Sequence, residues 1–175
     1  MKPAIKTWVD RVREIAQTFP QKEEEYYLEQ TLTGLLAGTA WSYGIRAITE
    51  VRVKRTGMDR EKNNGRLDLL LSTDKHRVAI EAKIQWDWTL IPENALAELQ
   101  NACSEVASIE GDIADTRLGM LFFVPWPTSE DQRKQLSKVI VPCLSKMLVE
   151  AKAGYYNATL PYPGAMLFAK MARKR

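Results

Sequence analysis

Two apolar runs joined by a four-residue polar turn constrain the fold of this chain more than any other feature. The runs lie in GRLDLLLSTDKHRVAIEAKI, residues 65–84, and the turn is residues 72–75. Runs rich in Leu, Val and Ile on either side of a short turn predict an antiparallel hairpin. Charged side chains interrupt both strands, Asp68 in the first and Glu81 and Lys83 in the second.

Alternation along the second strand places Glu81 and Lys83 on one face and Val78 and Ile80 on the other. A carboxylate within a buried strand is unfavourable unless it is paired or binds a metal ion. Carboxylates of Asp68 and Glu81 suit a hard cation such as Mg²⁺, which keeps several waters and can take a phosphate oxygen. A lysine beside such an ion can orient or deprotonate an attacking water. The hairpin therefore predicts a site for phosphodiester hydrolysis. The competing interpretation is a solvated salt bridge on an edge strand.

Apolar spacing predicts the elements around the hairpin. Recurrence at three and four residues predicts helices over residues 1–19, 22–37 and 92–107. Alternation predicts a half-buried strand over residues 45–54, with all its odd positions on one face. The continuous apolar run at residues 118–124 predicts a strand covered on both faces.

The C-terminal part carries weaker signals. Ser129 and Gln132 predict a capping box for a helix that Pro142 kinks or splits and that ends at Gly154. The last twenty residues contain few periodic signals, and we assign no element to them.

Length and charge limit the class of protein. A chain of 175 residues, 45% hydrophobic and 27% charged, predicts one domain over residues 1–175. The net charge of +3 does not identify a nucleic-acid partner, but seven basic and three acidic residues lie in residues 46–66, directly before the hairpin. No run approaches the roughly 18 apolar residues of a membrane span, and the charged N-terminus is unlike a signal peptide. We expect a cytoplasmic protein that does not contact a membrane. A glycine-rich phosphate loop is missing, so we expect no nucleotide cofactor.

The pattern resembles the PD-(D/E)xK nuclease superfamily. Asp68 is followed thirteen residues later by Glu81-Ala82-Lys83 across the hairpin, and the superfamily's leading proline is Leu67 here. The order helix, three strands, helix, strand over about residues 22–124 is similar to the restriction endonuclease-like αβββαβ core. The resemblance implies an α/β fold with a mixed central sheet flanked by helices, extended by N-terminal and C-terminal helical additions.

The resemblance also implies an activity and roles for the residues that match. The chain would be an endonuclease that hydrolyses DNA by a water activated by Mg²⁺, with Mn²⁺ as a substitute. Asp68 and Glu81 would be metal ligands, the Ala82 carbonyl a further ligand, and Lys83 the catalytic lysine. A symmetric homodimer would bring two such sites to both strands of a duplex.

Members of the superfamily often add a glutamate from the helix before the first strand. Glu29 is our preferred third acid, because leucines follow it on the inward side of that helix. Glu25, one turn earlier, and Glu50, on the first strand, remain alternatives. Gln100 lies where some members carry a supporting glutamine, although Ser104 replaces the tyrosine that follows it in the exonuclease branch.

Basic and aromatic residues near the hairpin suggest how a nucleic acid would be bound. Phosphate contacts are expected from a basic cluster around the first strand, consisting of Arg52, Lys54, Arg55 and Arg66. Trp86 and Trp88 are candidates for base stacking or for ordinary packing. The alternative function is a catalytically inactive nuclease-fold protein that binds DNA or another protein within a larger assembly.

Overall fold

The computed structural model describes residues 2–18, 29–56, 64–85, 93–124, 151–154 and 165–172, together with residues 129, 131, 132, 134 and 138. Within them the helices are α1 (Lys2–Thr18), α2 (Glu29–Ser42) and α3 (Glu93–Ala107). The strands are β1 (Arg46–Lys54), β2 (Asn64–Ser72), β3 (Arg77–Gln85), β4 (Thr116–Phe123), β5 (Ala151–Gly154) and β6 (Met166–Met171). No helix among the described residues is long and apolar enough to span a membrane.

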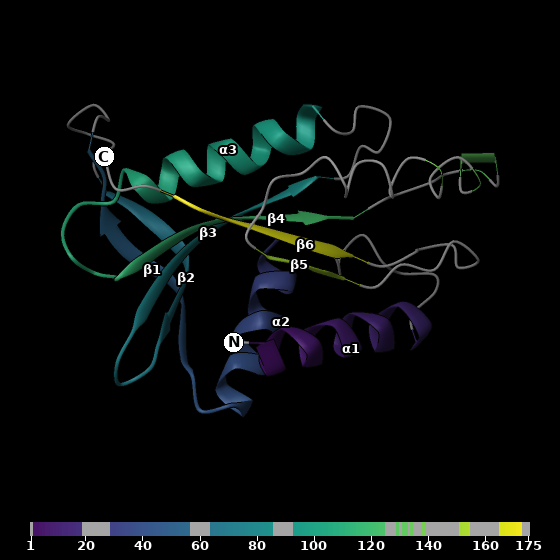
Figure 1. Ribbon diagram of the computed structural model, residues 1–175, viewed down its shortest axis with the longest axis horizontal. Coiled ribbons are helices and arrows are strands. Elements are labelled where there is room, and N and C mark those ends of the chain that lie inside the picture. Colours follow the sequence, from purple (N-terminus) through teal and green to yellow (C-terminus); the bar gives the residue numbers. More distant parts are fainter. Residues whose placement is uncertain are drawn as a thin grey trace.

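The strands form one mixed sheet in the order β1-β2-β3-β4-β6-β5 (Figure 1). Strands β1, β2 and β3 are antiparallel neighbours, β3 and β4 are parallel, and β6 runs antiparallel to both β4 and β5. Helix α3 connects the two parallel strands, as a parallel pair requires a long crossover. The α/β fold, the mixed sheet and the predicted hairpin of β2 and β3 are confirmed.

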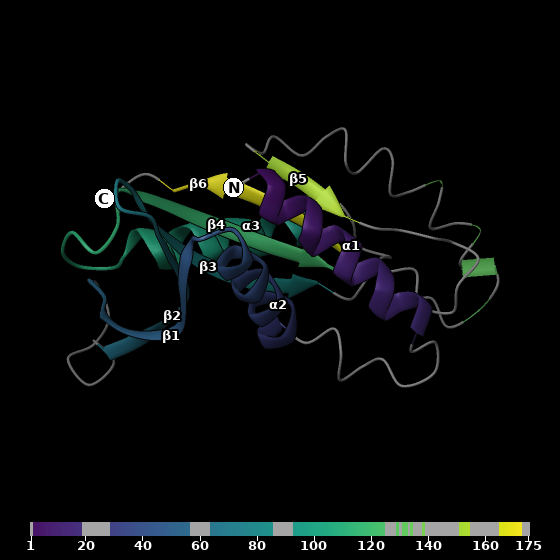
Figure 2. The same cartoon turned by 90° about the horizontal axis from the view of Figure 1, so that it is seen from below.

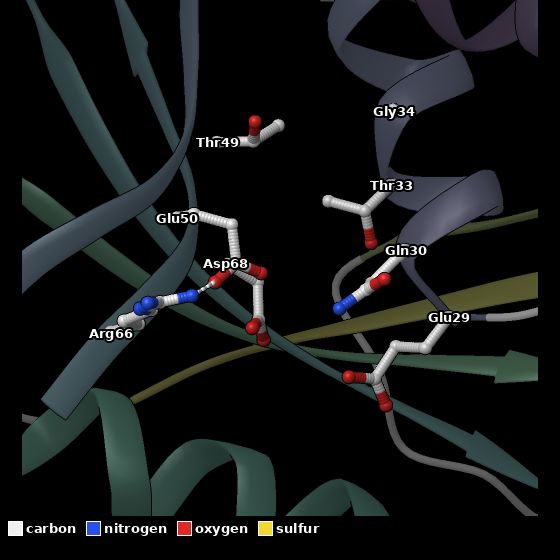
Figure 3. A pocket seen from close by; sticks show the side chains of 8 residues that line it. All are labelled: Glu29, Gln30, Thr33, Gly34, Thr49, Glu50, Arg66 and Asp68. Atoms are coloured by element: carbon white, nitrogen blue, oxygen red, sulfur yellow. Dashed lines mark hydrogen bonds and ion pairs between the residues drawn. The ribbon is translucent and has the colours of Figure 1, made fainter.

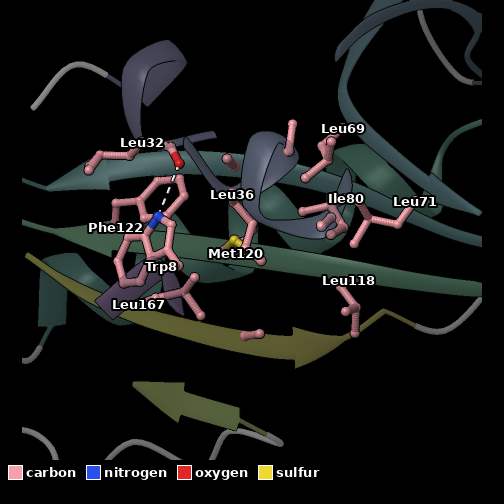
Figure 4. Close-up of a cluster of buried hydrophobic side chains, with 14 of the residues drawn as sticks. Trp8, Leu32, Leu36, Leu69, Leu71, Ile80, Leu118, Met120, Phe122 and Leu167 are labelled. Atoms are coloured by element: carbon pink, nitrogen blue, oxygen red, sulfur yellow. Dashed lines mark hydrogen bonds between the residues drawn. The ribbon is translucent and has the colours of Figure 1, made fainter. Parts of the chain in front are cut away.

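Helices cover both faces of the sheet: α1 and α2 lie on one side and α3 on the other (Figure 1, Figure 2). Trp8 of α1 is fully buried in the core between the α1–α2 layer and the sheet, and its ring stacks on Phe122 of β4 at a centroid distance of 5.7 Å (Figure 4). Its indole N–H donates to the Leu32 carbonyl of α2 over 3.2 Å. One aromatic side chain thus joins two helices to the sheet, with its polar atom satisfied.

Helix α3 packs closely against the opposite face because β4 has a glycine at the crossing point. A Cβ added at Gly119 would lie 2.6 Å from the backbone nitrogen of Cys103. Gly119 is paired with Glu81 in the parallel register of β3 and β4. The close approach therefore brings α3 directly over the part of β3 that carries Glu81. At the end of α3, the buried Arg117 donates to the carbonyls of Ala107 and Gly111, which occupies backbone acceptors there.

Two helix predictions need correction. Helix α2 continues beyond residue 37 to Ser42, and ends where the Ile45 N–H donates to the Ala40 carbonyl around Gly44, whose φ is 72°. Residues 22–28 lie outside the described part of the chain.

Residues 151–154, expected to end a helix, form strand β5 instead, and β6 was not predicted. Strand β6 pairs with β4 and β5, and β5 pairs with β6, so their pairing is not encoded in a local pattern. The capping box is confirmed by reciprocal bonds of 3.2 Å between Ser129 and Gln132, whereas Pro142 lies outside the described residues.

Candidate active site

The pairing of β1 with β2 is interrupted at the register position of Glu50 and Asp68, between the pairs Thr49–Leu69 and Val51–Leu67, and we call this point the bend. Ala47 packs in the core beneath α2 but Val53 packs beneath α3, although both occupy odd positions of β1. The prediction that these positions share one face is therefore wrong. Glu50 adopts a φ of 57°, a left-handed conformation that is uncommon for a residue with a side chain, and this reverses the faces of the strand.

Strand β2 separates from β3 at Asp68. The register of the two strands runs from Ser72 paired with Arg77 to Leu69 paired with Ile80. At the next position, an Asp68 carboxylate oxygen accepts a hydrogen bond of 2.6 Å from the Ala82 N–H. The side chain thus takes over the role of a backbone acceptor, and it is held beside the segment that contains Glu81, Ala82 and Lys83. Burial raises the pKa of Asp68, while the Ala82 bond acts in the opposite direction.

A cleft of about 310 Å³ opens between the first turns of α2 and the bend of β1 and β2 (Figure 3). We call it the acidic cleft, and its lining is Glu29, Gln30, Thr33 and Gly34 of α2, Thr49 and Glu50 of β1, and Arg66 and Asp68 of β2. Glu50 accepts a 3.2 Å hydrogen bond from the exposed Arg66. In Figure 3, the Glu29 and Asp68 carboxylates face the same space from opposite walls.

The pKa of Glu29 on α2 is affected by charged residues of the hairpin. Burial raises the pKa of Glu29 to about 7, and the charge of Asp68 is the next largest cause. Lys83 lowers this pKa by its positive charge, whereas Glu105 and Glu50 raise it. The fold thus brings Glu29 and Glu50, both candidates for the third acid, to the cleft of Asp68. Glu25 lies outside the described residues.

Beside the acidic cleft, four charged side chains form a partly buried group that we call the ion-pair cluster: Arg55, Glu81, Lys83 and Glu105. Arg55 donates to Glu81 over 2.9 Å, and each of these side chains is 5% exposed. Lys83 donates to Glu105 of α3 over 2.9 Å. Burial raises the pKa of Glu81 to about 8, and its shared hydrogen bond with the Glu105 carboxylate and the charge of Asp68 act in the same direction. Glu81 and Lys83 therefore lie on the same face of β3, as alternation predicts.

Lys83 is held in its cationic form. Burial alone would lower its pKa, but the hydrogen bond and negative charge of Glu105, followed by the charges of Glu81 and Glu29, raise the pKa above its usual value. Sequence reasoning missed Glu105, which is distant from the hairpin in sequence. The one signal for it is Gly119, whose missing side chain lets α3 approach β3 and β4.

Arg55, expected from the sequence to contact phosphate on the surface, is buried instead, since the residue is 4% exposed. Besides Glu81, its guanidinium donates to the carbonyls of Arg66 and Glu105 over 2.7 and 2.8 Å. A Cβ added at Gly65 would lie 2.5 Å from the Arg55 Nε, so this glycine leaves the room that the guanidinium needs. Arg55, directly after β1, thus links β2, β3 and α3 through its hydrogen bonds.

The other basic candidates remain on the surface. Arg52, Lys54 and Arg66 are exposed, and together with Val53 and Gly65 they line a second cleft of about 590 Å³, the basic cleft. Arg66 lines both clefts, which are therefore adjacent. Gln100 is on the exposed side of α3. Trp86 and Trp88 lie outside the described residues.

The donor chemistry of the site suits Mg²⁺. Within the described part of the chain, no three His, Cys, Asp or Glu side chains are arranged around a single ion position. Magnesium, however, is commonly held by one or two carboxylates and otherwise by water. The acidic cleft supplies hard oxygen donors from Glu29, Glu50 and Asp68, and a buried Thr33 hydroxyl that has no hydrogen-bond partner in the part of the chain that the structure describes. These residues fit a hydrated divalent cation.

Comparisons with known proteins give no direct indication of function. No family model matches the chain, and searches of curated proteins and of solved structures found no significant similarity.

Proposed function

We propose that this chain is a Mg²⁺-dependent endonuclease that hydrolyses DNA phosphodiester bonds, built on a restriction endonuclease-like PD-(D/E)xK core. The observation that carries the proposal is Asp68, which is bonded to the Ala82 N–H at the point where β2 leaves β3. This contact joins the carboxylate to the Glu81-Ala82-Lys83 segment, and the acidic cleft adds Glu29. Carboxylates from two strands and a helix next to a half-buried lysine are the groups that metal-assisted hydrolysis requires.

In this proposal Asp68 and Glu29 would hold the ion from opposite walls of the acidic cleft. The resemblance would add Glu81 and the Ala82 carbonyl as further ligands, and Glu50 is the alternative third acid. A bound Mg²⁺ would lower the pKa of a water and offset negative charge on the phosphate. Lys83 orients the attacking water and stabilises negative charge as the phosphate is attacked. Since Lys83 is held as a cation, it acts by charge and hydrogen bonding and does not remove the proton.

Substrate binding is assigned to the basic cleft. Arg52, Lys54 and Arg66 are exposed along β1 and β2, so a DNA strand bound through its phosphates would pass Arg66 into the acidic cleft. The pair between Arg66 and Glu50 is exposed and weak enough to exchange for a phosphate. Mn²⁺ would substitute for Mg²⁺, and a homodimer would bring two sites to one duplex.

The buried pair of Arg55 and Glu81 favours a second candidate. A guanidinium already neutralises the Glu81 carboxylate, so the residue has a satisfied partner without any metal. On this view the chain keeps a nuclease fold but only binds DNA, or a protein, within a larger assembly.

Cleavage by the purified chain separates the two candidates. Plasmid, linear and branched DNA are incubated with Mg²⁺, Mn²⁺ or EDTA, in parallel with Asp68→Asn, Lys83→Ala and the control Asp74→Asn. Asp74 is an exposed turn residue paired with Arg46, away from the site. The endonuclease proposal expects metal-dependent cleavage by the parent and Asp74→Asn proteins only. Lys83→Ala should still bind DNA within a few-fold of the parent. DNA binding by a parent protein that does not cleave would support the second candidate.

A further inference from the structure

The hydroxyl of Thr33 is an unexplained polar group in the wall of the acidic cleft. It is the side-chain oxygen that remains buried without a hydrogen-bond partner among the described residues, and the residue is 4% exposed. Thr33 lies one helical turn after Glu29, on the same side of α2. Figure 3 shows its hydroxyl on the α2 wall, near Gln30 and across the cleft from Glu50 and Asp68.

A threonine in a helix usually satisfies its hydroxyl within the helix, by donating to the carbonyl three or four residues earlier. Thr39, a buried threonine of the same helix, does this: its Oγ1 donates to the Leu36 carbonyl over 2.8 Å. Thr33 makes no such bond to the described residues, although it lies in the same helix. Because a buried hydroxyl without a partner is unfavourable, its partner should come from what the cleft binds.

The charge of the cleft identifies the class of partner. Glu29, Glu50 and Asp68 supply three carboxylates and Arg66 one cation, so the cleft favours a cation over an anion. A hydrated Mg²⁺ keeps several waters, each of which needs acceptors for its protons. A hydroxyl one turn from Glu29 is placed to accept from such a water.

We infer that Thr33 is a positioning residue that binds, through its hydroxyl, a water in the hydration shell of a divalent cation held in the acidic cleft. This inference rests on the metal site of the proposed function. Thr33 is not one of the site residues that the superfamily resemblance implies. Partners of this kind commonly change metal affinity 10- to 100-fold. The replacement Thr33→Val keeps the shape and removes the hydroxyl, whereas Thr33→Ser keeps the hydroxyl.

The test measures metal binding without DNA. Affinity for Mn²⁺, and for Mg²⁺ by competition, is measured by calorimetry for the parent protein, Thr33→Val, Thr33→Ser and Thr39→Val, together with the denaturation midpoint in EDTA. We expect Thr33→Val to bind both ions about tenfold more weakly while its metal-free midpoint equals or exceeds that of the parent. Thr33→Ser should keep the parent affinity. Thr39→Val should lose stability, because it leaves the Leu36 carbonyl without this bond, and should keep the metal affinity.

The outcomes separate this inference from the endonuclease proposal. Unchanged metal affinity in Thr33→Val would overturn the role of Thr33 even if the parent protein cleaves DNA. A tenfold loss in a protein that never cleaves DNA would support Thr33 and count against the endonuclease. A parent protein that binds neither ion would overturn both.

Discussion

At the scale of single residues, the site depends on charges that lie far apart in the sequence. Glu105 of α3 forms an ion pair with Lys83 of β3, and Arg55, directly after β1, forms one with Glu81. A buried charge is stable only with its partner in place, so each of these residues depends on another element for its ionisation state. Local alternation places Glu81 and Lys83 on one face, but it does not identify the residues that neutralise them.

Glu105→Gln should slow cleavage by about ten- to a hundredfold, because a lysine released from its partner moves away from the position it needs. The pKa of Lys83 should fall toward its usual value, since the Glu105 bond and charge raise it. Single-turnover rates against pH measure both effects. Glu98→Gln, also on α3, is the control. Parent-like rates in Glu105→Gln at every pH would show that Lys83 does not depend on this pair.

Glu29→Gln should lower activity more than Glu50→Gln. The charge of Asp68 is the second cause, after burial, of the raised pKa of Glu29, whereas Glu50 is exposed and paired with Arg66. Rates on the same DNA at saturating Mg²⁺ compare the two variants. The reverse order would assign the third acid to β1.

At the scale of elements, the packing of α3 on β4 sets the distance between Glu105 and β3. Gly119 faces the backbone of Cys103, which cannot rotate away as a side chain end can. The geometry of the ion-pair cluster therefore depends on the absence of one methyl group.

Gly119→Ala should destabilise the fold by about 2–3 kcal/mol, the cost of overpacking a close contact. Gly38→Ala is the matched control, because a Cβ there has nothing within 4 Å and the helix should gain about 0.5–1 kcal/mol. Denaturant unfolding measures both. Equal stability of Gly119→Ala and the parent would mean that α3 can shift away from β4 without cost.

At the scale of the whole molecule, two buried glutamates of the site make the stability of the fold depend on pH. The pKa of Glu29 is raised to about 7 and that of Glu81 to about 8, both from 4.5. The folded state therefore holds protons that the unfolded state has lost in this range, so these groups lower the free energy of unfolding as pH rises.

The free energy of unfolding of the protein in EDTA should fall between about pH 4.5 and 8, and level off above. In Glu29→Gln, the fall in the free energy of unfolding between pH 4.5 and 7 should be smaller than in the parent. The difference should be about 1–2 kcal/mol, once solvent screening of this half-buried group is allowed for. Urea unfolding of both proteins from pH 5 to 8 measures the difference. Mg²⁺ should restore stability most at pH 8, where the carboxylates are ionised. An identical pH dependence in the two proteins would show that Glu29 is not buried beside Asp68.

Local sequence patterns determined most of the helices and strands of this protein. The physical reason is that periodicity and capping depend on residues only a few positions apart in the chain. The period of α1, the alternation of β3 and the capping box of Ser129 and Gln132 are short-range features, and the structure contains each of them. The candidate residues Asp68, Glu81 and Lys83 were recognisable because charge in an apolar strand needs a local explanation.

Only the tertiary structure decided which side chains meet. Strand β6 forms by pairing with β4, and β5 forms by pairing with β6; such long-range pairing leaves no periodic signal of its own. The bend at Glu50 reverses the faces of β1 because the strand packs against α2 at one end and α3 at the other. The basic neighbours of Arg55 predict a surface position. The residue is buried because Gly65 leaves space for its guanidinium and Glu81 forms an ion pair with it. Burial and charge pairing are set by contacts between distant segments, and the spacing of residues in one segment does not contain them.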